Sequence, residues 1–594
     1  MSVGLAVKVV AGLAVAAVAA VLLEHYGLVG MSSPRPVRPQ VLHRPFPAPG
    51  DEATNIFWGL QISDLHISKF FDPGRAKDLE KFCSETVDII QPDVVLATGD
   101  LTDGLKSDRW GSRQFETEWQ TYQNVLKRTR VTEKTKWLDI RGNHDSFNIP
   151  SLESSHNYYR KYSALRRHGS MHYIHKTPFG NYSFIYVDAT LTPGPKKPFN
   201  FFGMLNEKQM KELLLLTEQT RYSNHTIWFG HYTTSTIISP VPGIRSLMSS
   251  AIAYLCGHLH LLGGMMPVLH TRHPKGTLEL ELGDWKENRR ILAFSPSSIT
   301  TVSVKINDVY LGNAVHLSGP IFILKWNPRN YSEEYSKIEV NVQDSTGRFK
   351  NVEHKFSIKG NIHTKFNFMQ SFILLTDHYI VARIIFVLIV MTPQLLLIIF
   401  RYSKKLELKG TPGFVNMTSF SFHILSKTDI FYYILLFLNS YTALGPWFIG
   451  EIVDGKMGCC FSFGIFVDGK FFQGSMTFII GIIQILLFNI PLLIYLCWTL
   501  LLRCQGYIFS SHFKGRYHKV LPVHILMLLF YACQIGSCYL LGKAYGTVAL
   551  LFSPMYAWLT LFIPILVRWA WILNPSELRP FSVELKNFMS SQSQ

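Results

Sequence analysis

Cysteine is scarce in this chain: only eight of its 594 residues are cysteines. Two of them, Cys83 and Cys256, precede residue 378, and they form no spacing pattern that indicates a disulfide framework. This scarcity argues against a small secreted scaffold held together by disulfide bonds. It does not identify the compartment in which the protein works.

Acidic residues are also few, since 41 Asp and Glu oppose 58 Lys and Arg, which gives a net charge of +17. Such an excess can mark a protein that binds nucleic acid. The basic residues form no stripe with interleaved aromatic residues, however, and many of them lie in short loops beside apolar segments. We therefore expect no nucleic-acid partner.

Long apolar runs are confined to the two ends of the chain. Residues 5–23 are apolar except for Lys8, which predicts that residues 1–30 are a signal peptide or an uncleaved signal anchor. The length of the run favours the anchor. Residues 31–54 are rich in Pro and Arg and are expected to form a linker.

The chain changes character from His378 onward. Five segments there are each near the length that crosses about 30 Å of hydrocarbon. They predict an all-α transmembrane bundle over residues 378–573 and a cytosolic tail at residues 574–594, so we expect an integral, multi-pass protein whose partner is the lipid bilayer. The expected spans are Ile380–Phe400, Ile430–Ile449, Met476–Leu501, Leu521–Leu541 and Gly546–Val567.

The loops between these expected spans differ in charge. The loops after the first and third spans are rich in Lys and Arg, whereas residues 451–475 carry three acidic and two basic residues. Because basic loops stay in the cytosol, everything before His378 is expected on the lumenal or extracellular side. Three glycosylation candidates then lie on that side, at Asn181, Asn224 and Asn330.

Five short polar motifs follow strand-like apolar runs between residues 57 and 260. They are Asp64-Leu65-His66, Gly99-Asp100, Gly142-Asn143-His144-Asp145, Gly230-His231 and Gly257-His258-Leu259-His260. Strand ends converge at one edge of a layered α/β domain, so these side chains are expected to meet. Carboxylates and imidazoles suit Zn, Mn and Fe ions, and a carboxylate such as that of Asp100 can bridge two ions.

Any one of these motifs is more often structural than catalytic, but the ordered set resembles the calcineurin-like metallophosphoesterase superfamily. The resemblance implies two divalent or transition metal ions (Mn, Zn or Fe) that share Asp100. It implies that His144 contacts the phosphate and assists the leaving group as a general acid. The implied ligands are Asp64, His66 and His260 for one ion, and Asn143, His231 and His258 for the other.

Two further carboxylates in these motifs have less certain roles. Asp103 and Asp145 either orient a ligand or a histidine from behind, or cap a helix. Asp103 also stands where the purple acid phosphatase branch has an iron-binding tyrosine, so the resemblance is to the phosphodiesterase-like branch.

We therefore expect an α/β fold, with a layered metallophosphoesterase sandwich over residues 55–290. Short alternating strands over residues 291–362 predict a small immunoglobulin-like β-sandwich that serves as a spacer. The resemblance extends to membrane-bound members of the superfamily over nearly the whole chain. In those members a longer stretch follows the segment at 284–290, so the completeness of the catalytic domain after Arg290 stays open.

Two functional classes follow from these observations. The first is a membrane-anchored, metal-dependent phosphoesterase that hydrolyses a phosphomonoester or phosphodiester. The residues leave its substrate open among lipid, nucleotide, protein and glycan phosphates, and membrane tethering favours a lipid or glycolipid. The second is a membrane receptor, transporter or scaffold with an inactive phosphoesterase-like domain. The complete ligand set favours the enzyme.

Overall fold

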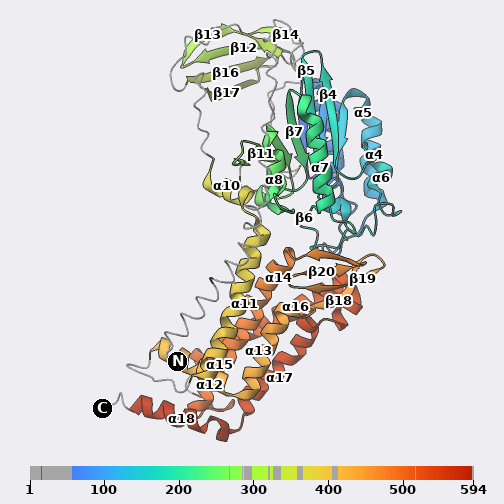
Figure 1. Cartoon of the computed structure of the whole chain (residues 1–594). Helices are drawn as coiled ribbons and strands as arrows, with labels where there is room; N and C mark the ends of the chain where they lie inside the picture. Colours follow the sequence, from blue (N-terminus) through green and yellow to red (C-terminus); the bar gives the residue numbers. More distant parts are fainter. Residues whose placement is uncertain are drawn as a thin grey trace.

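The computed structural model describes residues 15, 57–266, 268–283, 285, 297–318, 321–324, 336–356, 366–403, 413–514 and 517–590. Apart from residue 15, the expected N-terminal anchor and linker lie outside these residues, and so do residues 286–296 around Arg290. An α/β domain stands between a small β-structure, formed within residues 297–356, and a long helical region that begins at residue 368 (Figure 1).

The α/β domain contains two main sheets. The first is parallel, in the order β1-β2-β3, and the second has six strands in the order β10-β11-β9-β7-β5-β4, with β4 and β10 antiparallel to their neighbours. The strands of the first sheet are Gly59–Ile62, Val94–Ala97 and Lys136–Asp139. Those of the second, in sheet order, are Leu269–Arg272, Leu278–Glu281, Ala253–Cys256, His225–Gly230, Gly180–Val187 and Met171–Thr177.

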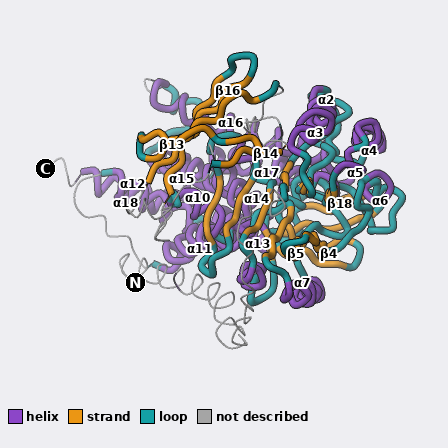
Figure 2. The backbone as a smooth tube through the Cα atoms, turned by 90° about the horizontal axis from the view of Figure 1, so that it is seen from above, coloured by secondary structure: helices purple, strands orange, loops and turns teal. Residues whose placement is uncertain are grey.

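The two sheets pack face to face, and helices cover their outer faces. Leu96 and Leu138 from the first sheet share an apolar cluster with Phe184 and Phe229 from the second. Helix α4 (Glu116–Thr129) buries Trp119 and Tyr122 against the first sheet, and helix α7 (Glu207–Gln219) covers the second. Figure 2 shows α2 to α6 on the side of the domain away from β13 and β16. This layering directs the carboxyl ends of the parallel strands toward one edge.

The immunoglobulin-like sandwich that we expected over residues 291–362 is not confirmed. The described residues form one antiparallel sheet in the order β13-β12-β16-β17 and a separate ribbon of β14 and β15. A sandwich requires two sheets packed face to face, about 10 Å apart. The strands β12 to β17 are Ile299–Ile306, Val309–Asn313, Val315–Ser318, Ile321–Ile323, Ser336–Asp344 and Phe349–Phe356.

Four helical stretches in the described residues are long and apolar enough to cross a membrane: His378–Tyr402 (α11), Met476–Cys504 (α14 to α15), Tyr517–Leu551 (α16) and Pro554–Ile572 (ending in α17). A fifth crossing exists if Phe414–Lys427 (α12) and Asp429–Leu444 (α13), bent by 93°, count as one span. Helix α18 (Pro575–Ser590) follows.

Four expected span boundaries were wrong. Helix α16 extends to Leu551, beyond the expected end at Leu541, and the last span ends at Ile572 instead of Val567. Helix α13 ends at Leu444 instead of Ile449, because Gly445-Pro446 follows and proline disfavours helical backbone before it. The last span begins at Pro554 instead of Gly546. Ser553, directly before Pro554, accepts a hydrogen bond from the backbone of Ala557. Proline in the first turn after such a cap is a favoured helix start.

A small antiparallel sheet lies where we expected a loop, at residues 451–475. Its strands β18 to β21 are Phe448–Val453, Lys456–Phe461, Gly464–Val467 and Lys470–Gln473, and they pair in chain order. Figure 1 shows this sheet between the long helices and the α/β domain. We call it the docking sheet.

Candidate metal centre

The structure brings all seven expected ligands together at the carboxyl ends of five parallel strands. Asp64 and His66 follow β1, Asp100 follows β2, Asn143 follows β3, His231 follows β7, and His258 and His260 follow β9. Five of these residues have left-handed backbone, with φ from 44° to 82°, which is uncommon outside glycine and concentrates at functional sites. The five are Asp64, His66, Asp100, His258 and His260.

Gly142 makes this close approach of two strand ends feasible. A Cβ atom built at this position would lie 2.1 Å from Oδ1 of Asp100. Glycine therefore lets the backbone before Asn143 pass next to the carboxylate of Asp100.

The first ligand group consists of Asp64, His66, His260 and Asp100, whose donor atoms all lie within 4.8 Å of one another. Nε2 of His260 is 2.9 Å from Oδ1 of Asp64 and 3.2 Å from Nε2 of His66. Nε2 of His66 lies 3.7 Å from Oδ2 of Asp100. Donor atoms this close to one another could hold one metal ion.

The second ligand group also adjoins Asp100. Oδ1 of Asn143 is 2.9 Å from Nε2 of His231 and 3.0 Å from Nδ1 of His258. Nε2 of His231 is 3.4 Å from Oδ2 of Asp100. Asp100 thus adjoins both groups, as a bridging carboxylate must.

The chemistry of these donors fits cations. His231 directs Nδ1 at the carbonyl oxygen of Thr98, 3.0 Å away, so Nδ1 donates and Nε2 is the nitrogen that faces Nδ1 of His258, at 3.2 Å. His66 and His260 bring two Nε2 atoms equally close. Neutral ring nitrogens that converge in this way need a proton or a cation between them. The residues therefore fit two metal ions.

Burial and charge set the protonation of the cluster when no cation is bound. Burial lowers the pKa of His66 and of His258 to about 3, which keeps both rings neutral. Burial raises the pKa of Asp100, but His231 and His144 outweigh it and hold that pKa well below its usual value. Burial lowers the pKa of His231, but the charge of Asp100 raises it to about 9. The Asp100 carboxylate therefore stays charged, and His231 carries a proton that a metal ion would have to displace.

His144 lies at the edge of this cluster and directs one nitrogen toward it. Its Nδ1 is 2.6 Å from the carbonyl oxygen of Asp103, an acceptor, so Nδ1 donates. Its Nε2 lies 3.9 Å from Oδ2 of Asp100. The Asp103 carboxylate is 3.7 Å from Nδ1 of both His66 and His144, so Asp103 lies behind two histidines.

Asp145 does not face the metal centre. Its carboxylate accepts hydrogen bonds from the backbone N–H groups of Leu101, Thr102 and Gly142, at 2.9 to 3.0 Å. It therefore ties the loop that carries Asp100 to the loop that carries Asn143.

Two residues that the sequence analysis missed brace the same loops. Glu118, in helix α4, accepts hydrogen bonds from the backbone of Lys69 and of Gly104 at 2.8 and 3.0 Å, and burial raises its pKa to about 7. Arg75 donates to the carbonyl oxygens of Asp64 and Leu65. Neither residue belongs to a motif, because each acts on backbone that only the fold brings near.

A cavity of about 580 Å³ opens beside the first ligand group and His144. Two arginines line it, and the guanidinium of Arg109 lies 4.5 Å from the ring centre of Phe71. The remaining lining residues are His66, Ser68, Asp72, Arg75, Asp103, Leu105, His144 and His260. The cavity therefore combines two arginines, two aspartates and apolar side chains next to the cluster, and Arg75 lies 3.6 Å from the carboxylate of Asp72.

The expected glycosylation residues lie elsewhere. Asn181 is exposed at the start of β5, and its backbone N–H donates to Oδ1 of Asn224 at 2.9 Å. Asn330 lies outside the described residues.

The fold and these ligands define a calcineurin-like phosphoesterase domain, and the family model of that description matches residues 60–262. A second model, described as the TMEM62 C-terminal domain, matches residues 378–554. Transmembrane protein 62 of Mus musculus is 59% identical over 640 aligned positions, which cover 99% of each chain. The chain therefore belongs to the transmembrane protein 62 family, and it is a multi-pass membrane protein with a phosphoesterase-like domain.

Two more distant similarities were found. An Arabidopsis thaliana protein described as a metallophosphoesterase is 30% identical over 304 residues, which cover 42% of this chain and 40% of that protein. The crystal structure of Vps29 from Chaetomium thermophilum matches with 10% identity and a TM-score of 0.17, over 51% of this chain and 99% of that chain. At that TM-score the second similarity supports no conclusion.

Proposed function

We propose that this protein is a membrane-anchored phosphoesterase with two metal ions, and that its catalytic domain works on the lumenal or extracellular side. The observation that carries the proposal is the convergence of two donor groups on Asp100, with His66 3.7 Å and His231 3.4 Å from the same carboxylate oxygen. A pair of ions at such a site polarises a phosphoryl group and supplies a nucleophilic water near neutral pH.

The protein's own side chains would divide the remaining work. Asp64, His66 and His260 would hold one ion, and Asn143, His231 and His258 would hold the other. His144 is fixed through Nδ1, so its Nε2 is the atom that would donate a proton to the leaving oxygen. Arg75 and Arg109, in the cavity wall, suit an anionic substrate.

The favoured substrate is a lipid or glycolipid phosphate, either a monoester or a diester. The cavity supports this class because Phe71 and Leu105 add apolar surface beside the arginines. The attachment to long apolar helices supports it as well, because it holds the domain near a bilayer.

The proposal is tested with the full-length protein in detergent micelles. After removal of metal with a chelator we expect no hydrolysis of an aryl phosphomonoester or of an aryl phosphodiester. Added Mn²⁺ or Zn²⁺ is expected to restore hydrolysis of at least one of them, with close to two ions bound per chain. A protein that holds two ions and hydrolyses neither ester would instead be a receptor, transporter or scaffold. A protein that binds no metal would refute the proposed centre.

The membrane orientation gives a separate prediction. A glycosylation tag inserted in the turn at Thr346, between β16 and β17, is expected to be modified. The same tag beside Lys514, in the basic loop between α15 and α16, is expected to stay unmodified because that loop is cytosolic. Sensitivity to a glycosidase, read as a change in gel mobility, distinguishes the two insertions. Modification beside Lys514 alone would show that the assigned side is wrong.

A further inference from the structure

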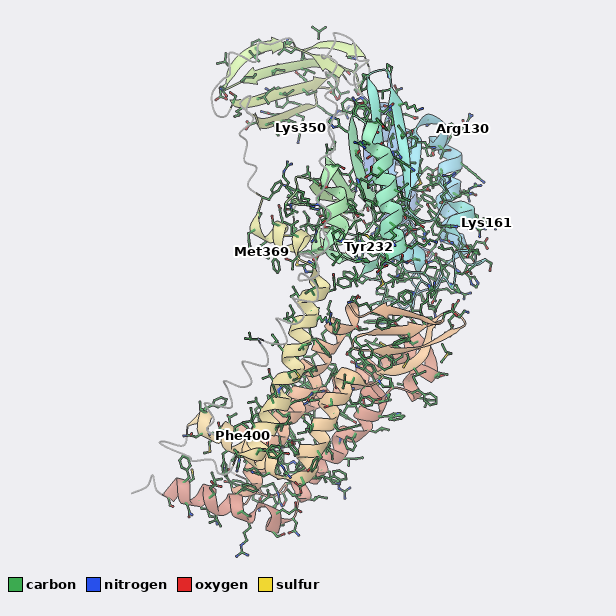
Figure 3. The ribbon with its side chains drawn as sticks, in the orientation of Figure 1. Arg130, Lys161, Tyr232, Lys350, Met369 and Phe400 are labelled. Atoms are coloured by element: carbon green, nitrogen blue, oxygen red, sulfur yellow. The ribbon has the colours of Figure 1, made fainter. Side chains whose placement is uncertain are left out.

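The segment at residues 188–202, between β5 and β6 (Gly203–Met204), contacts both the membrane region and the metal centre. We call it the connecting loop. Figure 3 labels Tyr232, which follows the ligand His231, at the end of the α/β domain that faces the membrane helices, whereas Lys350 lies on the far sheet. The metal centre is therefore at the end of the domain that meets the membrane region.

One side of the connecting loop is held by the docking sheet and by α16. The Phe199 ring centre lies 6.2 Å from that of Phe448 in β18 and 5.6 Å from that of Tyr545 in α16, within one buried apolar cluster. The backbone N–H of Lys196 donates to the carbonyl oxygen of Ile452 at 2.9 Å. The Tyr545 hydroxyl donates to the carbonyl oxygen of Lys197 at 2.7 Å.

Other bonds complete this attachment. The ammonium group of Lys470, in β21, donates to the carbonyl oxygen of Thr192 at 3.0 Å. Lys196 also lies 3.7 Å from the carboxylate of Glu451 in β18. These contacts come from two strands of the docking sheet, so the connecting loop is attached at several points along its length.

The other side of the connecting loop touches the second ligand group. Asn200 is 1% exposed, and its Nδ2 donates to the carbonyl oxygen of the ligand Asn143 at 2.6 Å. The Phe201 ring centre lies 4.6 Å from that of the ligand His258. The Tyr232 hydroxyl donates to the carbonyl oxygen of Asn200 at 3.1 Å. The connecting loop therefore contacts two ligands of the second group, Asn143 and His258, and Tyr232, which follows the third ligand.

The connecting loop also packs tightly against the loop of Asn143. Gly194 donates its N–H to the carbonyl oxygen of Ile149 at 2.8 Å. A Cβ atom at Gly194 would lie 1.8 Å from the carbonyl oxygen of Ser146. The two loops therefore shift together, because neither has room to slide past the other.

We infer that the membrane region positions the second metal subsite through the connecting loop, and that Asn200 is the positioning residue at the point of contact. The inference rests on the proposed two-metal centre. Partners that orient a metal ligand from behind typically change metal affinity by about 10–100-fold when they are removed. The membrane helices would then support metal binding at the second subsite, in addition to anchoring the domain.

The test uses full-length protein in lipid nanodiscs and a titration with Mn²⁺. Electron paramagnetic resonance counts the bound ions and detects the magnetic coupling between two adjacent ions. Asn200→Leu removes the amide donor at similar size, and Tyr545→Phe removes only the hydroxyl, at a position in the membrane region. Tyr539→Phe is the matched control, since that side chain lies on the same helix and is 61% exposed.

We expect Asn200→Leu to weaken binding of one ion by about 10–100-fold and to abolish the coupled signal at limiting Mn²⁺, while the other ion binds within about 2-fold of wild type. Tyr545→Phe is expected to weaken the same ion by about 2–10-fold, the value of one neutral hydrogen bond. The double variant should lose less than the product of the two single effects, because both residues act through one loop. Asn200→Gln, which keeps an amide donor, should recover part of the affinity.

Two results would overturn the inference. If Asn200→Leu and Tyr545→Phe, both folded by their thermal transitions, bind two ions as wild type does, the membrane region does not position the site. If Tyr545→Phe has the affinity of wild type while Asn200→Leu does not, Asn200 acts locally and the link to the membrane region is wrong. A wild-type protein that binds no Mn²⁺ would instead refute the metal centre itself.

Discussion

Asp100→Asn is expected to remove both metal ions and to lower the rate of phosphoester hydrolysis by at least about 10³-fold. Charge stabilisation by bound ions contributes several kcal/mol to such reactions, and about 4 kcal/mol corresponds to a factor of about 10³. Asp100 is the carboxylate that both donor groups share, at 3.7 Å from His66 and 3.4 Å from His231. Asparagine offers one oxygen and no charge, so it cannot bridge two cations. Elemental analysis and an aryl phosphate assay measure the two effects.

The matched control is Asp139→Asn, which changes another buried carboxylate near a strand end. Asp139 accepts hydrogen bonds from the Tyr122 hydroxyl and from the backbone of Ala164 and Leu165, away from the metal centre. We expect it to lower the melting temperature and to retain two ions. If Asp100→Asn still holds two ions, or if Asp139→Asn loses them equally, the bridging assignment is wrong.

The convergence of the seven expected ligands could be predicted from the sequence because each one follows a strand. A parallel strand ends at the same edge as its neighbours, so short motifs far apart in the chain, such as Asp64-Leu65-His66 and Gly257-His258, meet without further information. The left-handed backbone of five ligands could not be predicted in the same way. It follows from the packing of the loops around the site.

The docking sheet was missed although its sequence carries a signal for it. Asp454-Gly455 and Asp468-Gly469 each stand between strand-like residues, a strong local indication of a hairpin. Val453 pairs with Lys456 and Val467 pairs with Lys470, as two-residue turns require. Counting charges across residues 451–475 treated this stretch only as a loop. The helical periodicity on both sides of residues 451–475 obscures the strand-like alternation within them.

The residues that support the site are harder to find in a sequence. Asn200, Glu118 and Arg75 form hydrogen bonds with backbone atoms of distant loops. Nearly every residue type has the same backbone groups, so the sequence does not show which residue is the partner. Their partners are defined only once the layers are packed. In the sequence each of them is only an isolated polar residue, and its supporting role cannot be inferred.

His144→Ala is expected to keep the fold and both ions and to lower the rate on an aryl phosphodiester by about 10²–10⁴-fold, the range typical of general acid–base catalysis. The carbonyl oxygen of Asp103 holds Nδ1 as a donor at 2.6 Å, which leaves Nε2 toward the cluster, 3.9 Å from Asp100. The doubly protonated ring has a proton on Nε2 to give to a leaving oxygen. The seven ligand side chains are unchanged in this variant, so metal content serves as the internal check.

The leaving group decides whether the loss comes from proton transfer. An acidic phenol leaves without help, so the ratio of wild-type rate to His144→Ala rate should shrink as the phenol becomes more acidic. If His144 only positioned the phosphate, the ratio would be the same for every phenol. His175→Ala, which removes a histidine that lies 3.8 Å from Asp93 and outside the metal centre, should match wild type throughout. Equal rates of His144→Ala and wild type on two such esters, with both ions bound, would leave the phosphoesterase intact and remove His144 from its mechanism.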